Sequence, residues 1–177
     1  CPLPVLATLR SQAEGGEGPN DPAARSEILG TARDSGAALL DLEFERDARL
    51  IRTLGLAPEQ TVLSWHDPAG TPDGLTKITE RMIENSARWI KVVPSANSMR
   101  DLVLVLELHR RFNGGPHGNR RLITFAMGGS GAASRYLAPL FGPPIGFAAW
   151  NDEGPAAPGQ ITIDQTEAVI SHLHGPP

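Results

Sequence analysis

The segment TVLSWHDPAGTPDGLTKITERMIENSARWIKVVP, residues 61–94, decides the fold of this chain. It begins with a short apolar run, Thr61 to His66, and ends with another, Trp89 to Val93. Runs of this length that are rich in β-branched and aromatic residues predict buried strands. Between them, apolar residues recur at the spacing of one helix face: Leu75, Ile78, Met82 and Ile83. The segment therefore predicts two parallel strands joined by a helix.

The same alternation continues on both sides of this unit. Further strands are predicted over Val5 to Arg10, Leu39 to Glu43, Leu122 to Met127 and Ile145 to Ala149. Further helices are predicted over Asp21-Pro22 to Ser35, Asp47 to Leu54, Ser98 to Arg111, a short stretch after Gly131, and Ile163 to His172. This is an α/β fold with about six βα units and parallel strands. An open doubly wound sheet and a barrel both fit the pattern, although the glycines after the first strand lack the G-x-G-x-x-G spacing of a nucleotide turn.

The composition excludes several classes of function. The 177 residues fit one domain at about 150 residues per domain, so we expect a single domain over residues 1–177. A net charge of -4 gives no field that attracts nucleic acid or an acidic membrane surface. Cys1 is the only cysteine, which leaves no intrachain disulfide and no thiolate pair for a metal, and agrees with a cytoplasmic location. No apolar run approaches the ~18 residues of a membrane span.

Polar residues lie at or just beyond the carboxyl ends of the predicted strands, where parallel α/β sheets bind ligands. They are Arg10 with Glu14, Glu43, His66, and Met127 with Gly128. Lys91 differs from them because it interrupts an apolar run. Burial of an unpaired ammonium is unfavourable, so this lysine needs an explanation. The other histidines share no ligand spacing and are interpreted as helix-surface or loop residues: His109, His117, His172 and His174.

Two readings of Lys91 follow. In the first, burial lowers the pKa of the amine, and the free amine attacks a ketone to form a Schiff base, with His66 as the nearby base. In the second, Lys91 is an exposed edge residue or pairs with Glu43 in a buried ion pair, and His66 is a hydrogen-bonded residue at a strand end. The stretch Gly128-Gly129-Ser130-Gly131 also fits a phosphate loop, but that reading leaves Lys91 and His66 unexplained.

Six short motifs, in order, carry a resemblance to a known family. They are Thr8-Leu9-Arg10-Ser11 with Glu14-Gly15-Gly16, Leu40-Asp41-Leu42-Glu43, Leu63-Ser64-Trp65-His66-Asp67, Ile90-Lys91-Val92-Val93-Pro94, Ala126-Met127-Gly128 with Ser134-Arg135, and Ala157-Pro158-Gly159-Gln160-Ile161. Together they resemble the type I 3-dehydroquinate dehydratases, over nearly the whole chain. The resemblance implies a partial TIM (β/α)8 barrel, of which this chain has about six βα units.

The resemblance also implies a reaction. Lys91 matches the lysine that forms an imine with the C3 ketone of 3-dehydroquinate. His66 matches the acid and base that removes a C2 proton and protonates the departing C1 hydroxyl, a syn elimination that gives 3-dehydroshikimate in the shikimate pathway of aromatic amino acid biosynthesis. Glu14 matches the carboxylate that orients this histidine. No metal or other cofactor is implied, since the lysine is itself the source of the electrophile.

Four further positions match substrate-binding residues of the family. Arg10 and Arg135 match arginines that hold the substrate, and the fork of Arg135 suits a carboxylate. Gln160 matches a loop residue that closes over the bound acid, and Met127 matches an apolar wall near the imine. Ala156 departs from the pattern, because the family often has a serine four residues before the glutamine.

The family barrel has eight strands, and the resemblance begins at the third. We therefore expect an N-terminally truncated domain, without the second-strand Glu and Arg that contact substrate hydroxyls in the family. The isolated chain is expected to be weakly active or inactive, because half of the substrate cage is missing. A fragment, a domain of a fused shikimate-pathway polypeptide continuing beyond Gly175-Pro176-Pro177, and a naturally shortened relative all fit this expectation.

The last of these origins would be non-catalytic, like the ligand-sensing domain of a quinate-type repressor. Lys91, His66 and Glu14 together favour the enzyme, a lyase, because a sensor has no physical reason to keep a buried lysine. A Schiff-base aldolase on a similar barrel would share Lys91 but has no need of the loop from Ala157 to Gln160. The expected partner is the small-molecule substrate, with no nucleic acid and no membrane, and a homodimer or fused pathway domains stay open.

Overall fold

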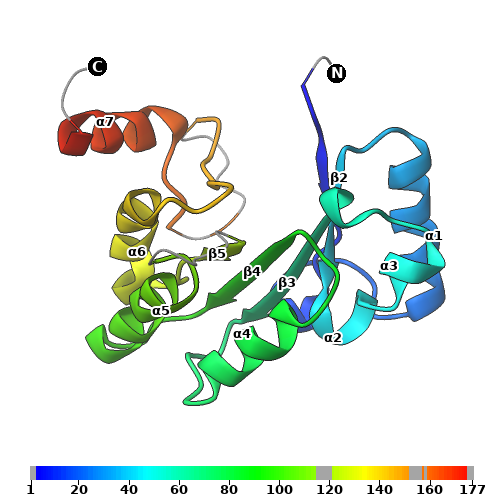
Figure 1. Cartoon of the computed structure of the whole chain (residues 1–177), viewed down its shortest axis with the longest axis horizontal. Coiled ribbons are helices and arrows are strands. Elements are labelled where there is room, and N and C mark those ends of the chain that lie inside the picture. Colours follow the sequence, from blue (N-terminus) through cyan, green and yellow to red (C-terminus); the bar gives the residue numbers. More distant parts are fainter. Residues whose placement is uncertain (1–2, 115–120, 152–156, 158, 175–177) are drawn as a thin grey trace. The chain divides into compact units, whose positions relative to one another are not determined.

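The structure is a computed structural model that describes residues 3–114, 121–151, 157 and 159–174 (Figure 1). Within these residues the strands form one sheet in the order β1-β2-β3-β4-β5. They are β1 (Leu6–Thr8), β2 (Leu39–Glu43), β3 (Thr61–Asp67), β4 (Trp89–Pro94) and β5 (Leu122–Thr124). β1 pairs with β2 and β2 with β3 in parallel, which confirms the predicted α/β fold.

The helices follow the strands along the chain in the order that the sequence predicts. Over the described ranges they are α1 (Pro22–Asp34), α2 (Phe44–Asp47), α3 (Leu50–Thr53), α4 (Leu75–Ile83), α5 (Met99–Phe112), α6 (Ala132–Leu137) and α7 (Ile163–His174). Short 3-10 turns are η1 (Gln12–Glu14), η2 (Pro58–Gln60), η3 (Gly129–Gly131) and η4 (Ala138–Phe141). α1 and α5 begin where predicted, because the side chains of Asp21 and Ser98 accept hydrogen bonds from backbone N–H groups in the first turn.

The predicted strand-helix-strand unit is present. The chain leaves β3, passes through α4 and returns in β4, the neighbour of β3 in the sheet (Figure 1). α4 buries Leu75 and Met82, and Ile90 and Val92 of β4 are fully buried. Removal of this apolar surface from water stabilises the unit at about 25 cal/mol per Å². Lys91 lies between Ile90 and Val92 and is carried into the interior with them.

Two predicted elements differ in kind from the structure, and the strands predicted over Val5 to Arg10 and Leu122 to Met127 are shorter, as β1 and β5. The predicted strand over Ile145 to Ala149 is wrong in extent, because these described residues form only an isolated parallel bridge between Ala149 and Thr162. Pro143-Pro144 directly before them carries no backbone N–H, and Gly146 has no side chain to pack, so a continuous strand is disfavoured. The helix predicted over Asp47 to Leu54 is shorter in the structure: it contains α3, and α2 ends at its first residue, Asp47.

The chain divides into two compact units. The first comprises Cys1–Pro68 and Asp73–Val92, and its buried core includes Leu29, Leu40, Leu42, Leu63, Met82 and Ile90. The second comprises Ala69–Pro72 and Val93–Pro177, and its buried core includes Leu102, Val105, Leu108, Leu122 and Ile123. The single domain expected over residues 1–177 stays a prediction.

β2 brings two carboxylates into the interior of the first unit. Side chains alternate between the two faces of a strand, so Leu40 and Leu42 share one face and Asp41 and Glu43 share the other. All four are buried, with exposures of 1%, 0%, 1% and 0% in the order Leu40, Leu42, Asp41 and Glu43. Two buried acids need partners, and the partners they find form the candidate site.

Candidate active site

Lys91 lies inside the first unit. It is 7% exposed, so the reading of Lys91 as an exposed edge residue is wrong. Its Nζ donates a hydrogen bond to Oδ2 of Asp41 on β2 at 3.2 Å, which makes a buried ion pair. The sequence predicts Glu43 as the acid of such a pair, whereas the acid in hydrogen-bond contact is Asp41, two residues earlier on the same face of β2.

Asp41 is held by three side chains. Nη2 of Arg10 donates to both carboxylate oxygens, at 2.9 Å and 3.0 Å, and the hydroxyl of Ser64 donates to Oδ1. Lys91 completes the set at Oδ2. Burial opposes ionisation of Asp41, but the charges of Lys91 and Arg10 and the hydrogen bond from Ser64 outweigh it and hold the pKa of Asp41 well below its usual range. Asp41 is therefore a fixed negative charge beside the lysine.

His66 at the end of β3 is paired with Glu14 of η1. Nδ1 of His66 lies 2.9 Å from Oε2 of Glu14, and the backbone N–H of His66 donates to the same oxygen at 3.1 Å. Burial, and then the charge of Glu43, raise the pKa of Glu14 to about 8, while the charges of Arg10 and Arg46 act in the opposite direction. The pair fixes the imidazole through Nδ1, so Nε2 is the ring nitrogen directed away from Glu14.

Arg10 joins the two pairs. Its Nη1 donates to Oε2 of Glu14 at 3.1 Å, to Oε1 of Glu43 at 3.2 Å and to the Ser64 hydroxyl at 2.9 Å. Its Nη2 holds Asp41. One guanidinium thus fixes the carboxylates beside both Lys91 and His66. The substrate-binding role of Arg10 stays a prediction.

Arg25 supports this arrangement from α1. It is 1% exposed and donates to Asp47 from Nε at 2.9 Å and from Nη2 at 2.5 Å. Arg25 also donates to the carbonyl oxygens of Leu9 and Pro19, at 2.9 Å and 3.0 Å, and its Nη2 lies 3.4 Å from Oε2 of Glu43. These bonds tie α1 and α2 to the residue that precedes Arg10.

The other predicted site residues belong to the second unit. Arg135 of α6 is 7% exposed, and its guanidinium carbon lies 4.5 Å from the ring centroid of Phe125. Burial lowers the pKa of Arg135, and among the described residues its Nε has no hydrogen-bond partner. Met127 is half-buried beyond β5, and the backbone N–H of Gln160 donates to the Ala157 carbonyl at 3.1 Å.

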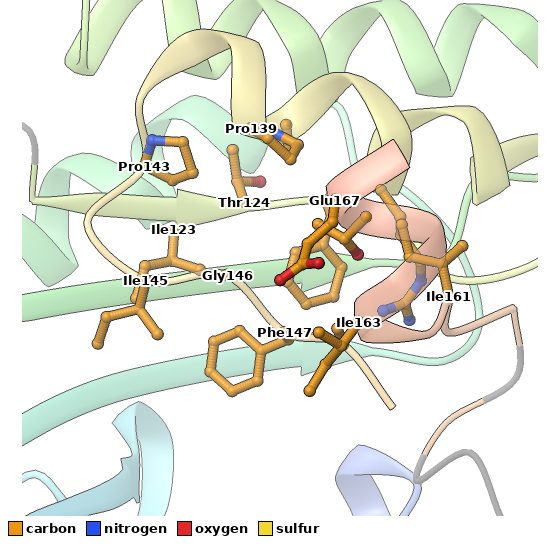
Figure 2. A pocket seen from close by; sticks show the side chains of 15 residues that line it. Ile123, Thr124, Pro139, Pro143, Ile145, Gly146, Phe147, Ile161, Ile163 and Glu167 are labelled. Atoms are coloured by element: carbon orange, nitrogen blue, oxygen red, sulfur yellow. The ribbon is translucent and has the colours of Figure 1, made fainter. Parts of the chain in front are cut away.

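A cavity of about 350 Å³ opens in the second unit (Figure 2). Its wall is mainly apolar, and Figure 2 shows Ile123, Phe147 and Ile163 among the side chains that line it. The polar residues in the wall are Thr124, Arg135, Thr166 and Glu167. A buried guanidinium in such a wall is suited to bind a carboxylate through paired, charge-assisted hydrogen bonds.

His109 corrects one expectation. The prediction of His109 as a surface or loop residue is wrong, because this residue of α5 is 1% exposed. Its Nε2 lies 2.8 Å from the carbonyl oxygen of Thr124, its Nδ1 lies 3.2 Å from the Asn113 amide, and its ring stacks on Phe141. Burial lowers the pKa of His109, which makes it a neutral core residue.

The glycine stretch offered as a phosphate loop is a packed turn before α6. A Cβ at Gly131 would lie 2.8 Å from Cβ of Ala126, so the backbone approaches too closely for a side chain. Ser134 holds the turn by donating to the Gly131 carbonyl oxygen at 2.6 Å. Packing therefore explains the glycine at this position.

Within the described ranges, no group of three or more His, Cys, Asp and Glu side chains is arranged to hold a metal ion. The helices of that same part of the chain are each too short or too polar to cross a membrane. Some residues discussed above lie outside the described set: His117, the side chain of His174, Ala156, Pro158 and Gly175 to Pro177.

The chain is similar to known proteins over almost its whole length. The family model for type I 3-dehydroquinase matches residues 1–176. A 3-dehydroquinate dehydratase of Dehalococcoides mccartyi is 34% identical over 166 residues, covering 92% of this chain and 72% of that relative. The crystal structure of the Clostridium difficile type I 3-dehydroquinate dehydratase, with covalently modified comenic acid, has a TM-score of 0.81 at 27% identity and covers 97% of this chain and 68% of that one. The dehydroquinate dehydratase and shikimate dehydrogenase of S. pombe AroM has a TM-score of 0.75 at 27% identity and covers 98% of this chain and 33% of that one.

These relatives agree with the fold. The solved dehydratases are TIM barrels, and the five strands of one sheet in the described residues, against about six predicted, agree with a fold of that class. The class of protein is a lyase. The chain belongs to the type I 3-dehydroquinase family.

Proposed function

We propose that this chain dehydrates 3-dehydroquinate to 3-dehydroshikimate through an imine on Lys91. One observation carries the proposal: Lys91 and His66 are the two ends of one hydrogen-bonded network in the first unit. Asp41, Arg10 and Glu14 connect them. A nucleophilic amine, an acid-base group and a residue that orients this group are the set that a Schiff-base elimination requires.

The first step joins Lys91 to the substrate. The ammonium loses one proton, and the amine nitrogen forms a bond to the C3 ketone carbon. The ketone oxygen leaves as water, with the released proton and a second proton from the nitrogen. The Lys91 nitrogen starts as an ammonium and ends as an iminium, so it carries a charge of about +1 at both ends of the step.

The second step is the elimination. His66 removes a proton from C2, and the electron pair of that bond moves toward the iminium, which becomes a neutral enamine. The enamine returns the electrons as the C1 hydroxyl departs, and this hydroxyl takes the proton from His66. One base acting at both positions makes a syn elimination the natural course. Water then hydrolyses the iminium, which releases the product and the lysine.

Glu14 serves this step by fixing the ring of His66. The 2.9 Å contact at Nδ1 and the 3.1 Å bond from the backbone N–H to the same Glu14 oxygen leave the ring little freedom to rotate. With Nδ1 engaged, Nε2 is the nitrogen that would exchange protons with C2 and the leaving hydroxyl. The orientation of a base by a third group is a general requirement of this kind of catalysis.

The substrate contacts belong to the proposal as well. The buried guanidinium of Arg135, with an Nε that has no hydrogen-bond partner among the described residues, supports its role in holding the carboxylate. Gln160 would close over the bound acid and Met127 would form an apolar wall. Arg10 would add a contact through the exposed part of its side chain, which is 15% exposed.

The cellular setting is proposed from the same evidence. A dehydratase of this kind would act in the cytoplasm, in the biosynthetic shikimate pathway or in quinate degradation. The S. pombe relative that joins a dehydratase to a shikimate dehydrogenase supports fused pathway domains as one possible partner arrangement. A homodimer is the other arrangement that the sequence analysis leaves open.

Conversion of 3-dehydroquinate, followed by the conjugated enone absorbance of the product, tests the proposal. We expect weak conversion by the chain and its loss in Lys91→Ala. Conversion should be retained in Lys77→Ala, a matched change at the only other lysine, which is exposed on α4. Equal rates in Lys91→Ala and the unchanged chain would contradict it. Binding of 3-dehydroquinate without any conversion would favour the ligand-sensing alternative.

A further inference from the structure

We propose that Asp41 is the positioning residue for the reactive lysine: its carboxylate fixes the Lys91 amine in place and stabilises positive charge on that nitrogen. The catalytic part of this proposal rests on the proposed function. The electrostatic part concerns two side chains of the chain itself and stands without any substrate.

The geometry makes Asp41 a rigid anchor. Both of its oxygens accept from Nη2 of Arg10, and Oδ1 also accepts from the Ser64 hydroxyl. Its side chain is 0% exposed, so water does not compete for these bonds. A carboxylate held by Arg10 and Ser64 cannot rotate to follow a moving amine, and Lys91 is therefore held where Oδ2 lies.

The charge of Asp41 has an effect that changes along the reaction. The resting ammonium and the iminium both carry a positive charge at the Lys91 nitrogen, and a buried carboxylate 3.2 Å away stabilises both of them. The neutral amine between these states receives no such stabilisation. Asp41 therefore stabilises the ammonium and the iminium relative to the free amine, and it holds the nitrogen in the same place in all of these states.

Other charged groups surround this pair. In the described part of the first unit they are Arg10 beyond β1 and His66 on β3, whose charges act on Asp41, and Glu14 on η1 and Glu43 on β2, which Arg10 links to it. Arg10 contacts Asp41 directly and also carries a positive charge, so it opposes charge on Lys91. Removal of the Asp41 charge would leave Lys91 in a buried site with Arg10 close by, which further disfavours the ammonium.

The variant Asp41→Asn keeps the shape of the side chain and removes its charge. The chain contains two lysines, Lys77 and Lys91, so lysine-selective 13C labelling gives two ε-carbon signals that can be titrated separately by NMR. We expect the midpoint of Lys91 to fall by about 1–3 pH units in Asp41→Asn. Lys77 is exposed on α4 and serves as the internal reference, with an unchanged midpoint.

Asp47→Asn is the matched control. Asp47 is 1% exposed and is paired with Arg25, so this change also removes a buried acid but leaves the contacts of Lys91 in place. We expect its Lys91 midpoint to equal that of the unchanged chain. A Lys91 midpoint that is the same in folded Asp41→Asn and in Asp47→Asn would overturn the proposal.

A kinetic measurement tests the positioning role. We expect kcat for 3-dehydroquinate to fall by about 10- to 1000-fold in Asp41→Asn with a much smaller change in KM, because the Lys91 nitrogen loses the charged anchor that holds it in place for the reaction. If Asp41→Asn does not fold, Asp41→Glu keeps the charge and moves it by one methylene. A reduced kcat with an unchanged Lys91 midpoint in that variant supports positioning, whereas an unchanged kcat contradicts it.

The two proposals can fail separately. A chain that shows the midpoint shift but never converts 3-dehydroquinate would leave the electrostatic role of Asp41 intact and contradict the proposed function. The chain could instead convert 3-dehydroquinate through Lys91 while neither kcat nor the titration midpoint of Lys91 changes in Asp41→Asn. That result would support the proposed function and contradict the proposed role of Asp41.

Discussion

Nδ1 of His66 lies 2.9 Å from Oε2 of Glu14, and the backbone N–H of His66 bonds the same oxygen at 3.1 Å. Glu14 is in the 3-10 turn after β1 and His66 is at the end of β3, so the pairing depends on the sheet. The double contact fixes both the position and the orientation of the imidazole. It follows that changes at Glu14 and at His66 have different consequences, which can be measured.

Removal of the imidazole should separate imine formation from elimination. His66→Ala is expected to retain a borohydride-reducible adduct on Lys91, because the nitrogen and its partner Asp41 are unchanged. Exchange of the C2 proton with deuterium should fall by about 10²- to 10⁴-fold, the usual contribution of a positioned base. NMR of 3-dehydroquinate in deuterated buffer measures this exchange. Exchange at the rate of the unchanged chain would contradict the role of His66 as the base that removes the C2 proton.

Glu14 should make the stability of the chain depend on pH. Burial raises its pKa from 4.5 to about 8 in the folded chain. Below pH 4.5 this carboxyl is protonated in both states, and between 4.5 and about 8 only the folded state holds the proton, so stability falls as pH rises through this window. Above about pH 8 both states are ionised and the difference is constant.

Glu14→Gln should abolish this part of the pH dependence. Urea unfolding at several pH values would show the variant gaining stability relative to the unchanged chain as pH rises from 4.5 to about 8. Glu17→Gln is the control, since Glu17 is exposed three residues further along. A pH dependence shared by the unchanged chain and both variants would contradict the burial of Glu14.

Arg135 should matter for binding more than for turnover. Arg135→Lys keeps the charge but loses the fork that grips a carboxylate with two hydrogen bonds. We expect KM for 3-dehydroquinate to rise by about 10- to 100-fold while kcat changes little. Arg110→Lys, an exposed change on α5, should leave KM unaltered. Steady-state kinetics measure both values, and a fall in kcat alone would assign Arg135 a different role.

Arg25 should contribute strongly to the free energy of unfolding of the chain. Arg25→Ala leaves the buried carboxylate of Asp47 without its guanidinium, so we expect the free energy of unfolding to fall by about 3–5 kcal/mol. Arg33→Ala breaks an ion pair with Asp34 at the surface and should change stability far less. Chemical denaturation measures the free energy of unfolding of both variants. Equal losses of this free energy would contradict a stabilising role for the buried pair of Arg25 and Asp47.

Much of the fold follows from local pattern. In the segment from Thr61 to Pro94, two continuous apolar runs flank a stretch whose apolar residues recur at helical spacing, which predicts β3, α4 and β4. Asp21 and Ser98 mark the starts of helices because their side chains cap the first turn. The strand predicted over Ile145 to Ala149 fails because a strand also needs a paired neighbour. Apolar spacing contains no information about that neighbour.

The candidate site could be predicted in part. Lys91 is conspicuous because a charge interrupts a buried run. His66 and Glu14 lie at or just beyond the carboxyl ends of predicted strands, and the family motifs add their roles. Asp41 was missed as a functional residue, although an aspartate between Leu40 and Leu42 was a usable signal. Its importance lies in pairings across strands, with Ser64 and Lys91, and these depend on sheet register rather than on spacing along the chain.

The central claim is that Lys91 is the nucleophile. Reduction with borohydride in the presence of 3-dehydroquinate, followed by mass spectrometry of the proteolytic peptides, tests it most directly. We expect a covalent adduct on the peptide that contains Lys91 and none on the peptide that contains Lys77. Adduct on Lys77 alone, or bound 3-dehydroquinate with no adduct on Lys91, would contradict it.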